Sequence, residues 1–198
     1  MAPAIEGGAI KGAAVREFIR WYAGREGPSR LRTIVDRMPE VHRKRLDPDS
    51  PALGLLANTW YEADLVHALL DAMAQDMDAR QRDELARGGA EAVMAATLKG
   101  LYKVLFSWMA SPARYARFSP KLWASYYDCG EFEVQSEPGR AVCTIRNWST
   151  HHAVICDLNR EAARQIYLAM GCKGVNTERT RCVAEGHDHC CFVTTWDE

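Results

Sequence analysis

The cysteines are the residues of this sequence whose type and spacing offer the clearest chemistry. All seven lie between positions 129 and 191 of the 198-residue chain. Cys182 and Cys190 flank the polar turn 183–189, and strand-like segments lie on both sides of it. Pairing of these segments would bring the two thiols together, and Cys156 precedes the last expected helix near the same sheet edge. Three thiolates with a carboxylate, an imidazole or a water can hold tetrahedral zinc, so the spacing is compatible with a metal site.

The fourth ligand of such a site is open at this point, with Glu178, His187 and His189 as candidates. Buried cysteines are also common as small core residues. Because the chain has no CxxC pair, spacing alone favours that second interpretation.

Two other pairs offer weaker chemistry. Cys190 and Cys191 resemble a vicinal redox pair, but neighbours in a strand point to opposite faces. His151 and His152 near Cys156 suggest a Cys–His nucleophile, yet no orienting residue or oxyanion motif accompanies them, so we interpret them as a solvated loop pair.

Composition excludes several classes of protein. A net charge of −1 gives no electrostatic reason to bind nucleic acid. No run of about 18 apolar residues predicts a membrane span, and the first residues lack the features of a signal peptide. We therefore expect a cytoplasmic protein with reduced thiols. The motifs HExxH and GxSxG and a glycine-rich phosphate loop are missing from the sequence, so no enzyme is expected.

The first two-thirds of the chain has the period of helices. Val15, Phe18, Ile19 and Tyr22 predict a helix from Gly12, and further apolar stripes predict helices over 29–38, 63–77 and 93–108. Residues 59–62 have the pattern of a capping box. We expect Gly88-Gly89 to interrupt the helical stretch, and the Ser-Pro pairs 111–112 and 119–120 to start two short helices.

The period changes from 3.6 to 2 after residue 130, which predicts a hairpin over 131–148. A helix from Asp157 or Asn159 to Gly171 and two strands, 175–184 and 190–196, follow. We predict an α+β fold, with N-terminal helices packed on a small C-terminal antiparallel sheet. The chain is interpreted as a single domain over 1–198, in which 1–128 is mainly helical and 129–198 is the α+β part with the cysteine hairpin.

The segment 182–192 resembles the C-terminal signature of the 4-vinyl-reductase domain. The preceding residues, with Ser111-Pro112 and the stretch 122–128, resemble a paralogous group expanded in myxobacteria. This family is related to haem nitric-oxide-binding domains and to TRAPP vesicle-tethering subunits. The resemblance implies a TRAPP-like or 4-vinyl-reductase-like sandwich of helices on an antiparallel sheet, usually dimeric.

The resemblance also implies a structural zinc ion held by three cysteines, here Cys156, Cys182 and Cys190, and a glutamate. Arg179 stands where that glutamate is expected, and Glu178 is one residue away, which turns it to the other face of a strand. The predicted metal ligands are therefore the three cysteines with Glu178. The Tyr-x-Ser-x-Arg motif of the haem relatives is missing from the sequence, so no haem is expected.

We predict a non-enzymatic sensor that binds a small apolar or aromatic ligand between the helices and the sheet. An apolar cavity of roughly 300 Å³ or more would support this function, and a solid core would favour a dimeric TRAPP-like scaffold with a protein partner. A weaker alternative is an accessory protein in tetrapyrrole reduction. The predicted pocket residues are aromatic: Trp108, Trp123, Tyr126, Phe132 and Trp148.

Overall fold

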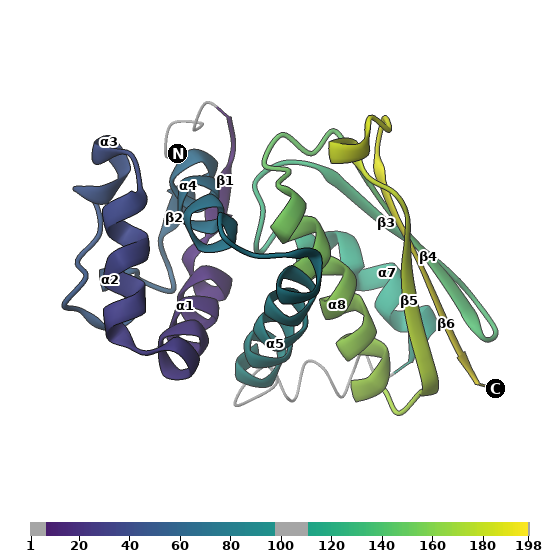
Figure 1. The fold of residues 1–198 in the computed structure, drawn as a ribbon. Helices are drawn as coiled ribbons and strands as arrows, with labels where there is room; N and C mark the ends of the chain where they lie inside the picture. Colours follow the sequence, from purple (N-terminus) through teal and green to yellow (C-terminus); the bar gives the residue numbers. More distant parts are fainter. Residues whose placement is uncertain (1–6, 98–110, 198) are drawn as a thin grey trace.

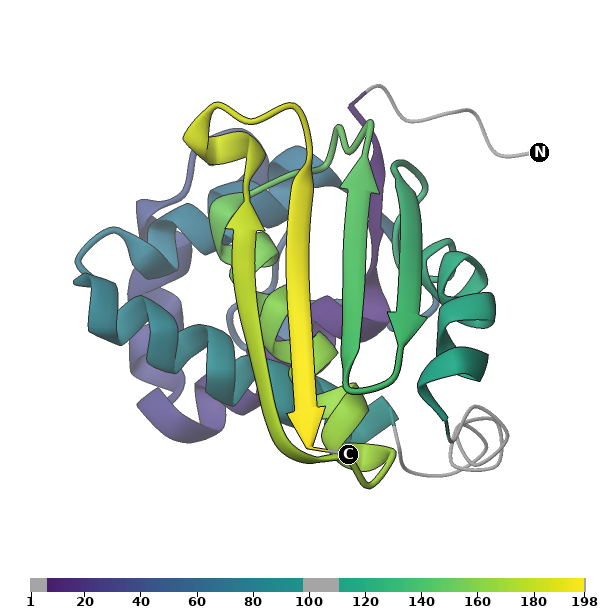
Figure 2. The same cartoon turned by 90° about the vertical axis from the view of Figure 1, so that its right-hand side faces the viewer.

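Layers of helices lie on one side of a four-stranded antiparallel sheet (Figure 1). The structure is a computed structural model that describes residues 7–97 and 111–197. Figure 2 views the sheet face on, with the helices behind it. The predicted α+β class is confirmed. The elements are, in order, β1 (Ala9–Lys11), α1 (Gly12–Glu26), α2 (Pro28–Arg37), α3 (Glu40–Arg43), η1 (Pro51–Gly54), β2 (Trp60–Glu62), α4 (Ala63–Ala74), α5 (Ala79–Thr97), α7 (Pro112–Trp123), β3 (Glu131–Glu137), β4 (Arg140–Arg146), α8 (Ala153–Ala169), β5 (Lys173–Arg181), η2 (Val183–Glu185) and β6 (Cys190–Asp197).

A two-stranded ribbon is formed by the short strands that precede α1 and α4. Strand β1 pairs antiparallel with β2, with Ile10 opposite Tyr61. The predicted capping box at 59–62 is therefore wrong. Glu62 precedes α4 without a side-chain cap, because residues 60–62 are extended and pair with a strand about fifty positions earlier. A local pattern cannot reveal such a distant partner.

Helix α5 continues through Gly88 and Gly89, contrary to the expected interruption. Both glycines face α1 at close range. A Cβ atom on Gly88 would overlap the Trp21 ring, and one on Gly89 would overlap the Phe18 ring and lie 3.1 Å from Leu158 Cδ2 on α8. The two glycines thus allow α5 to pack closely between α1 and α8, and this packing offsets their low helix propensity.

The sheet has the strand order β3-β4-β6-β5, and all neighbours are antiparallel. The inner face of β4 carries Ala141, Cys143 and Ile145, which are buried, and β6 adds Phe192. Helices α7 and α8 cover this face. The alternation predicted for the hairpin is therefore that of a half-buried antiparallel sheet.

Helix α8 begins at Ala153, which is earlier than the predicted start at Asp157 or Asn159. The His152 side chain caps it, because Nδ1 accepts a hydrogen bond from the Val154 amide at 3.2 Å. Cys156 consequently lies in the first turn of the helix. The second Ser-Pro pair also starts no helix, since Pro120 lies inside α7, whereas Ser111 caps α7 as predicted.

Among the described residues, the structure contains no helix with the length and apolar character needed to span a bilayer.

The close approach of α5 to α1 predicts opposite responses to the same substitution. Gly24 lies on α1 with open space around it, so Gly24→Ala should stabilise the fold by about 0.5–1 kcal/mol through helix propensity. Gly89→Ala gains the same propensity but overpacks Phe18, and it should be less stable than Gly24→Ala by about 1–3 kcal/mol. Urea unfolding of both variants measures this difference. Equal stabilisation by the two substitutions would contradict the role assigned to Gly89.

Candidate functional site

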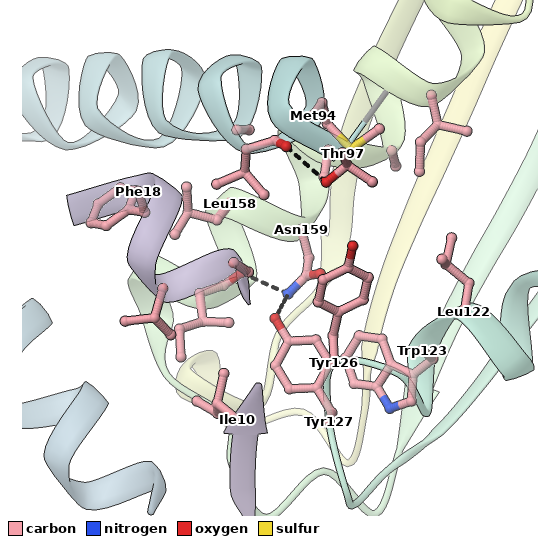
Figure 3. A pocket seen from close by; sticks show the side chains of 18 of the residues that line it. Ile10, Phe18, Met94, Thr97, Leu122, Trp123, Tyr126, Tyr127, Leu158 and Asn159 are labelled. Atoms are coloured by element: carbon pink, nitrogen blue, oxygen red, sulfur yellow. Dashed lines mark hydrogen bonds between the residues drawn. The ribbon is translucent and has the colours of Figure 1, made fainter. Parts of the chain in front are cut away.

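An apolar pocket lies between the helices and the sheet (Figure 3). Its volume is about 180 Å³, which is below the roughly 300 Å³ expected for a sensor. It is slightly larger than an engineered cavity of about 150 Å³ that takes up benzene or xenon. The pocket thus has room for a molecule of one or two rings. Its walls come from α1 (Phe18), α5 (Val93, Met94), α7 (Leu122, Trp123), α8 (Ile155, Leu158, Asn159, Ala162) and the sheet (Phe132, Cys143, Phe192).

The predicted pocket aromatics are placed in three different ways. Trp123, Tyr126 and Phe132 line the pocket. Trp148 is buried outside the lining, where its indole N–H donates to Thr150 Oγ1 at 2.7 Å. Trp108 lies outside the described residues. Apolar placement in the sequence does not separate these cases, because only tertiary packing selects the rings that face the pocket. Whether the three lining rings contact a ligand stays a prediction.

Stacked rings form one wall of the pocket. The Trp123 ring stacks on Tyr127 with centroids 4.1 Å apart and on Phe132 at 5.2 Å. Trp148 meets Trp123 edge-on at 5.2 Å, and Trp123 Nε1 donates to the Cys129 carbonyl at 2.9 Å. These contacts hold the wall in one arrangement, since offset and edge-to-face pairs are the favoured geometries of aromatic rings.

A single carboxamide interrupts the apolar lining contributed by α8. Asn159 Nδ2 donates to the Tyr127 hydroxyl at 3.0 Å and to the Ile155 carbonyl at 2.9 Å. In Figure 3 the side chain projects between Tyr126 and Tyr127. The sequence analysis assigned no role to Asn159. The signal was present, because it is a polar residue on the helical stripe formed by Ile155, Ala162 and Ile166.

The ionisable groups around the pocket are held neutral. Burial raises the pKa of Tyr127 to about 12 and that of Cys143 to about 12. Burial also raises the pKa of Tyr115 well above its usual value. These groups therefore carry no charge near neutral pH, and the pocket suits an uncharged molecule.

A second site is a buried cluster of His151, Cys156, Cys182 and Cys190 (the Cys/His cluster). Its four ligand atoms lie within 4.8 Å of one another. Cys156 Sγ is 3.7 Å from both Cys190 Sγ and Cys182 Sγ. Cys182 Sγ is 3.5 Å from His151 Nε2. The three thiols come from the first turn of α8, the residue between β5 and η2, and the start of β6, and the histidine comes from the loop before α8.

Three of the six separations are close to the edges of a zinc tetrahedron, namely the two S···S distances of 3.7 Å and the S···N distance of 3.5 Å. Zn–S bonds of about 2.3 Å and Zn–N bonds of about 2.0–2.1 Å place two sulfurs about 3.8 Å apart and a sulfur and a nitrogen about 3.6 Å apart. The cluster thus has the ligand types and the number of a closed four-coordinate site, with all ligand atoms within 4.8 Å of one another. All three cysteines are free thiols.

The structure brings the three predicted cysteines together but replaces the predicted fourth ligand. Glu178 is exposed and accepts a hydrogen bond from Asn176 Nδ2 at 2.9 Å, away from the cluster. His151, which was interpreted as a solvated loop residue, takes that position. The sequence places His151 five residues before Cys156, which is the one feature that could have indicated a shared site. Only the loop geometry shows that the His151 ring turns toward Cys182.

The other two candidates for the fourth ligand make different contacts. His187 Nδ1 lies 3.1 Å from the Cys182 carbonyl oxygen and His189 Nδ1 lies 2.7 Å from Asp188. Arg179, at the position expected to be acidic, forms ion pairs of 2.7 Å with Asp157 and with Glu185. It therefore links β5 to the start of α8 and to η2.

The thiols of the cluster differ in their acidity. The Cys156 thiol donates a hydrogen bond to Cys190 Sγ, and this bond together with His151 lowers the pKa of Cys190. The same bond and burial raise the pKa of Cys156, and burial raises that of Cys182. Ionisation of Cys190 is therefore the easiest of the three.

Comparison with solved structures finds H-NOX proteins with the same fold. The H-NOX protein from K. algicida, in its Fe(II) unliganded state, has a TM-score of 0.69 and 14% identity, over 96% of this chain and 97% of that one. The H-NOX protein from S. oneidensis in the Fe(II)NO state has a TM-score of 0.64 and 11% identity, over 96% and 100%. A structure from a study of haem distortion in the H-NOX family has a TM-score of 0.63 and 9% identity, over 96% of both chains. Comparisons of the sequence with protein-family models and with curated proteins gave no match.

Identification of the chain as a 4-vinyl-reductase domain is therefore wrong, and so is the TRAPP-like assignment. The solved structures compared above, which share its fold, are H-NOX proteins, and no family model matches the cysteine hairpin that suggested the resemblance. A short cysteine pattern in a hairpin is too small a part of the chain to identify a family. The expected homodimer, the protein partner and the lack of enzymatic activity stay predictions.

The expectation that haem plays no part was also wrong, because the proteins that share this fold are haem proteins. That expectation depended on one missing motif. The described lining of the pocket offers apolar and aromatic surface but neither a histidine nor a lysine or arginine, and residues 98–110 contain no histidine. The described lining of the pocket does contain tyrosine, methionine and cysteine, which are haem ligands in other proteins. The residues present thus do not fit a histidine-ligated haem.

Proposed function

We propose that this chain is a small-molecule-binding sensor domain whose ligand is a small, largely apolar molecule of one or two rings. The observation that carries the proposal is the preformed apolar pocket with its stacked aromatic wall and neutral ionisable groups. Such pockets with few polar groups are the usual form of small-molecule sites. Haem is a second candidate for the same pocket, favoured by the H-NOX fold alone.

Filling the pocket should weaken ligand binding. Ala162 lines the pocket, whereas Ala169 is exposed at the end of the same helix. We expect the purified full chain to bind indole in isothermal titration calorimetry. Ala162→Leu should weaken the binding at least tenfold because its side chain occupies the cavity, and Ala169→Leu should leave it unchanged.

Haem is the competing candidate, and it is titrated into the wild-type chain and the same two variants. A Soret band that saturates at one haem per wild-type chain, and that does not develop in Ala162→Leu, would favour haem over an organic ligand. Binding of neither haem nor small ring compounds to the wild-type chain would contradict the proposed function.

We propose in addition that the Cys/His cluster holds one structural zinc ion with Cys156, Cys182, Cys190 and His151 as its ligands. Four protein ligands and complete burial of the three cysteines are features of structural zinc sites, which leave no position for a substrate. The ion would connect the start of α8 to β5 and β6. The ion pairs of Arg179 support the same junction from outside the ligand shell.

The zinc proposal predicts different effects for the two rival fourth ligands. The purified chain should contain one zinc ion per molecule by elemental analysis, and a chelator should lower its melting temperature. His151→Ala and Cys182→Ser should lower both the zinc content and the melting temperature. Glu178→Gln should change neither, because Glu178 lies outside the cluster. Metal-free protein with unchanged melting, or loss of zinc in Glu178→Gln alone, would refute the assignment.

A further inference from the structure

The polar groups in the pocket wall are mostly occupied by their own helices. Thr97 Oγ1 donates to the Val93 carbonyl at 2.8 Å, and Ser119 Oγ donates to the Ala116 carbonyl at 3.0 Å. Such bonds leave these side chains little capacity for a ligand. Asn159 differs, because its two hydrogen bonds use only the amide nitrogen.

The orientation of the Asn159 carboxamide follows from its partners. The Ile155 carbonyl can only accept a hydrogen bond, so the group facing it must be the NH₂ group. The second N–H points to the Tyr127 hydroxyl. Both donors are thus engaged, and Oδ1 accepts no hydrogen bond from any residue in the described ranges 7–97 and 111–197.

The position of this oxygen is held from two sides. Tyr127, which binds the amide nitrogen, stacks on Trp123 at 4.1 Å and meets Trp148 edge-on at 5.7 Å. The Ile155 carbonyl belongs to the helix that carries Asn159. An acceptor that is fixed before the ligand arrives loses little entropy on binding, which is the condition for selective recognition.

We propose that Asn159 determines the specificity of the pocket, with Oδ1 accepting a hydrogen bond from an N–H or O–H group of an uncharged, mainly apolar ligand. This inference rests on the proposed sensor function and names the ligand class more closely. Asn159 is half-buried, and a ligand in the pocket would cover its oxygen. An acceptor that the ligand covers without supplying a donor is unfavourable, so an analogue of equal shape that lacks the donor binds more weakly. One neutral hydrogen bond predicts a difference of about three- to tenfold in affinity.

Three ring compounds of nearly equal shape test the inference on the full chain. Indole carries an N–H donor, indene has a CH₂ group in its place, and benzofuran has an oxygen that can only accept. Calorimetry should show that the wild-type chain binds indole about three- to tenfold more tightly than indene or benzofuran. In Asn159→Leu the preference for indole over indene and benzofuran should disappear.

The outcomes separate this inference from the proposed function. Equal affinity of the wild-type chain for all three compounds, or a preference for indole that persists in Asn159→Leu, overturns the role of Asn159 and leaves the pocket as a binding site. Lack of binding by all three overturns both the role of Asn159 and the small ring compound as the ligand of the pocket. If Asn159→Leu does not fold, the ligand series on the wild-type chain alone decides, because it needs no substitution.

Discussion

The burial of helix α8 between the sheet and α5 is the constraint on which both candidate sites depend. Tyr167 is fully buried, stacks on Trp196 of β6 at 4.9 Å and meets Tyr115 of α7 edge-on at 5.8 Å. Arg160, two turns earlier on α8, pairs with Asp83 of α5 at 2.7 Å. The helix is thus attached both to the sheet and to α5, and its aromatic contacts are costly to break because large side chains fill the space around it.

Successive turns of this helix serve the two sites. Cys156 in the first turn belongs to the Cys/His cluster, and Asn159 one turn later reaches the pocket. Residues three apart in a helix lie near the same face, so a shift of the start of α8 would move both side chains together. The cap that His152 provides and the ion pair of Arg179 with Asp157 both act on that start.

The H-NOX fold and the chemistry of the pocket give different indications about the ligand. The fold is that of proteins that carry haem iron, but functions differ among proteins of one fold because they reside in the site. The described pocket wall has stacked rings, neutral hydroxyls and one free carboxamide oxygen. These groups are the basis on which an uncharged ring compound is proposed, whereas the fold is the basis on which haem is a candidate.

Local pattern in the sequence was sufficient for much of the fold. The helical spacing of Val15, Phe18 and Ile19, the change of period after residue 130 and the turn of the first hairpin predicted elements that the structure contains. They could be predicted because periodicity reports which face of an element is buried. The cysteines of the cluster were also identifiable, since their residue type restricts their chemistry.

Contacts between distant segments decided the rest. Residues 60–62 are a strand because Ala9–Lys11 pairs with them, and α5 tolerates two glycines because the rings of α1 occupy the space beside them. His151 replaces Glu178 in the cluster because the loop before α8 turns its ring toward Cys182. The sequence by itself determined which residues can bind a metal or line an apolar core. Only the tertiary structure decided which of them meet, because side-chain contacts depend on packing across segments that no local pattern describes.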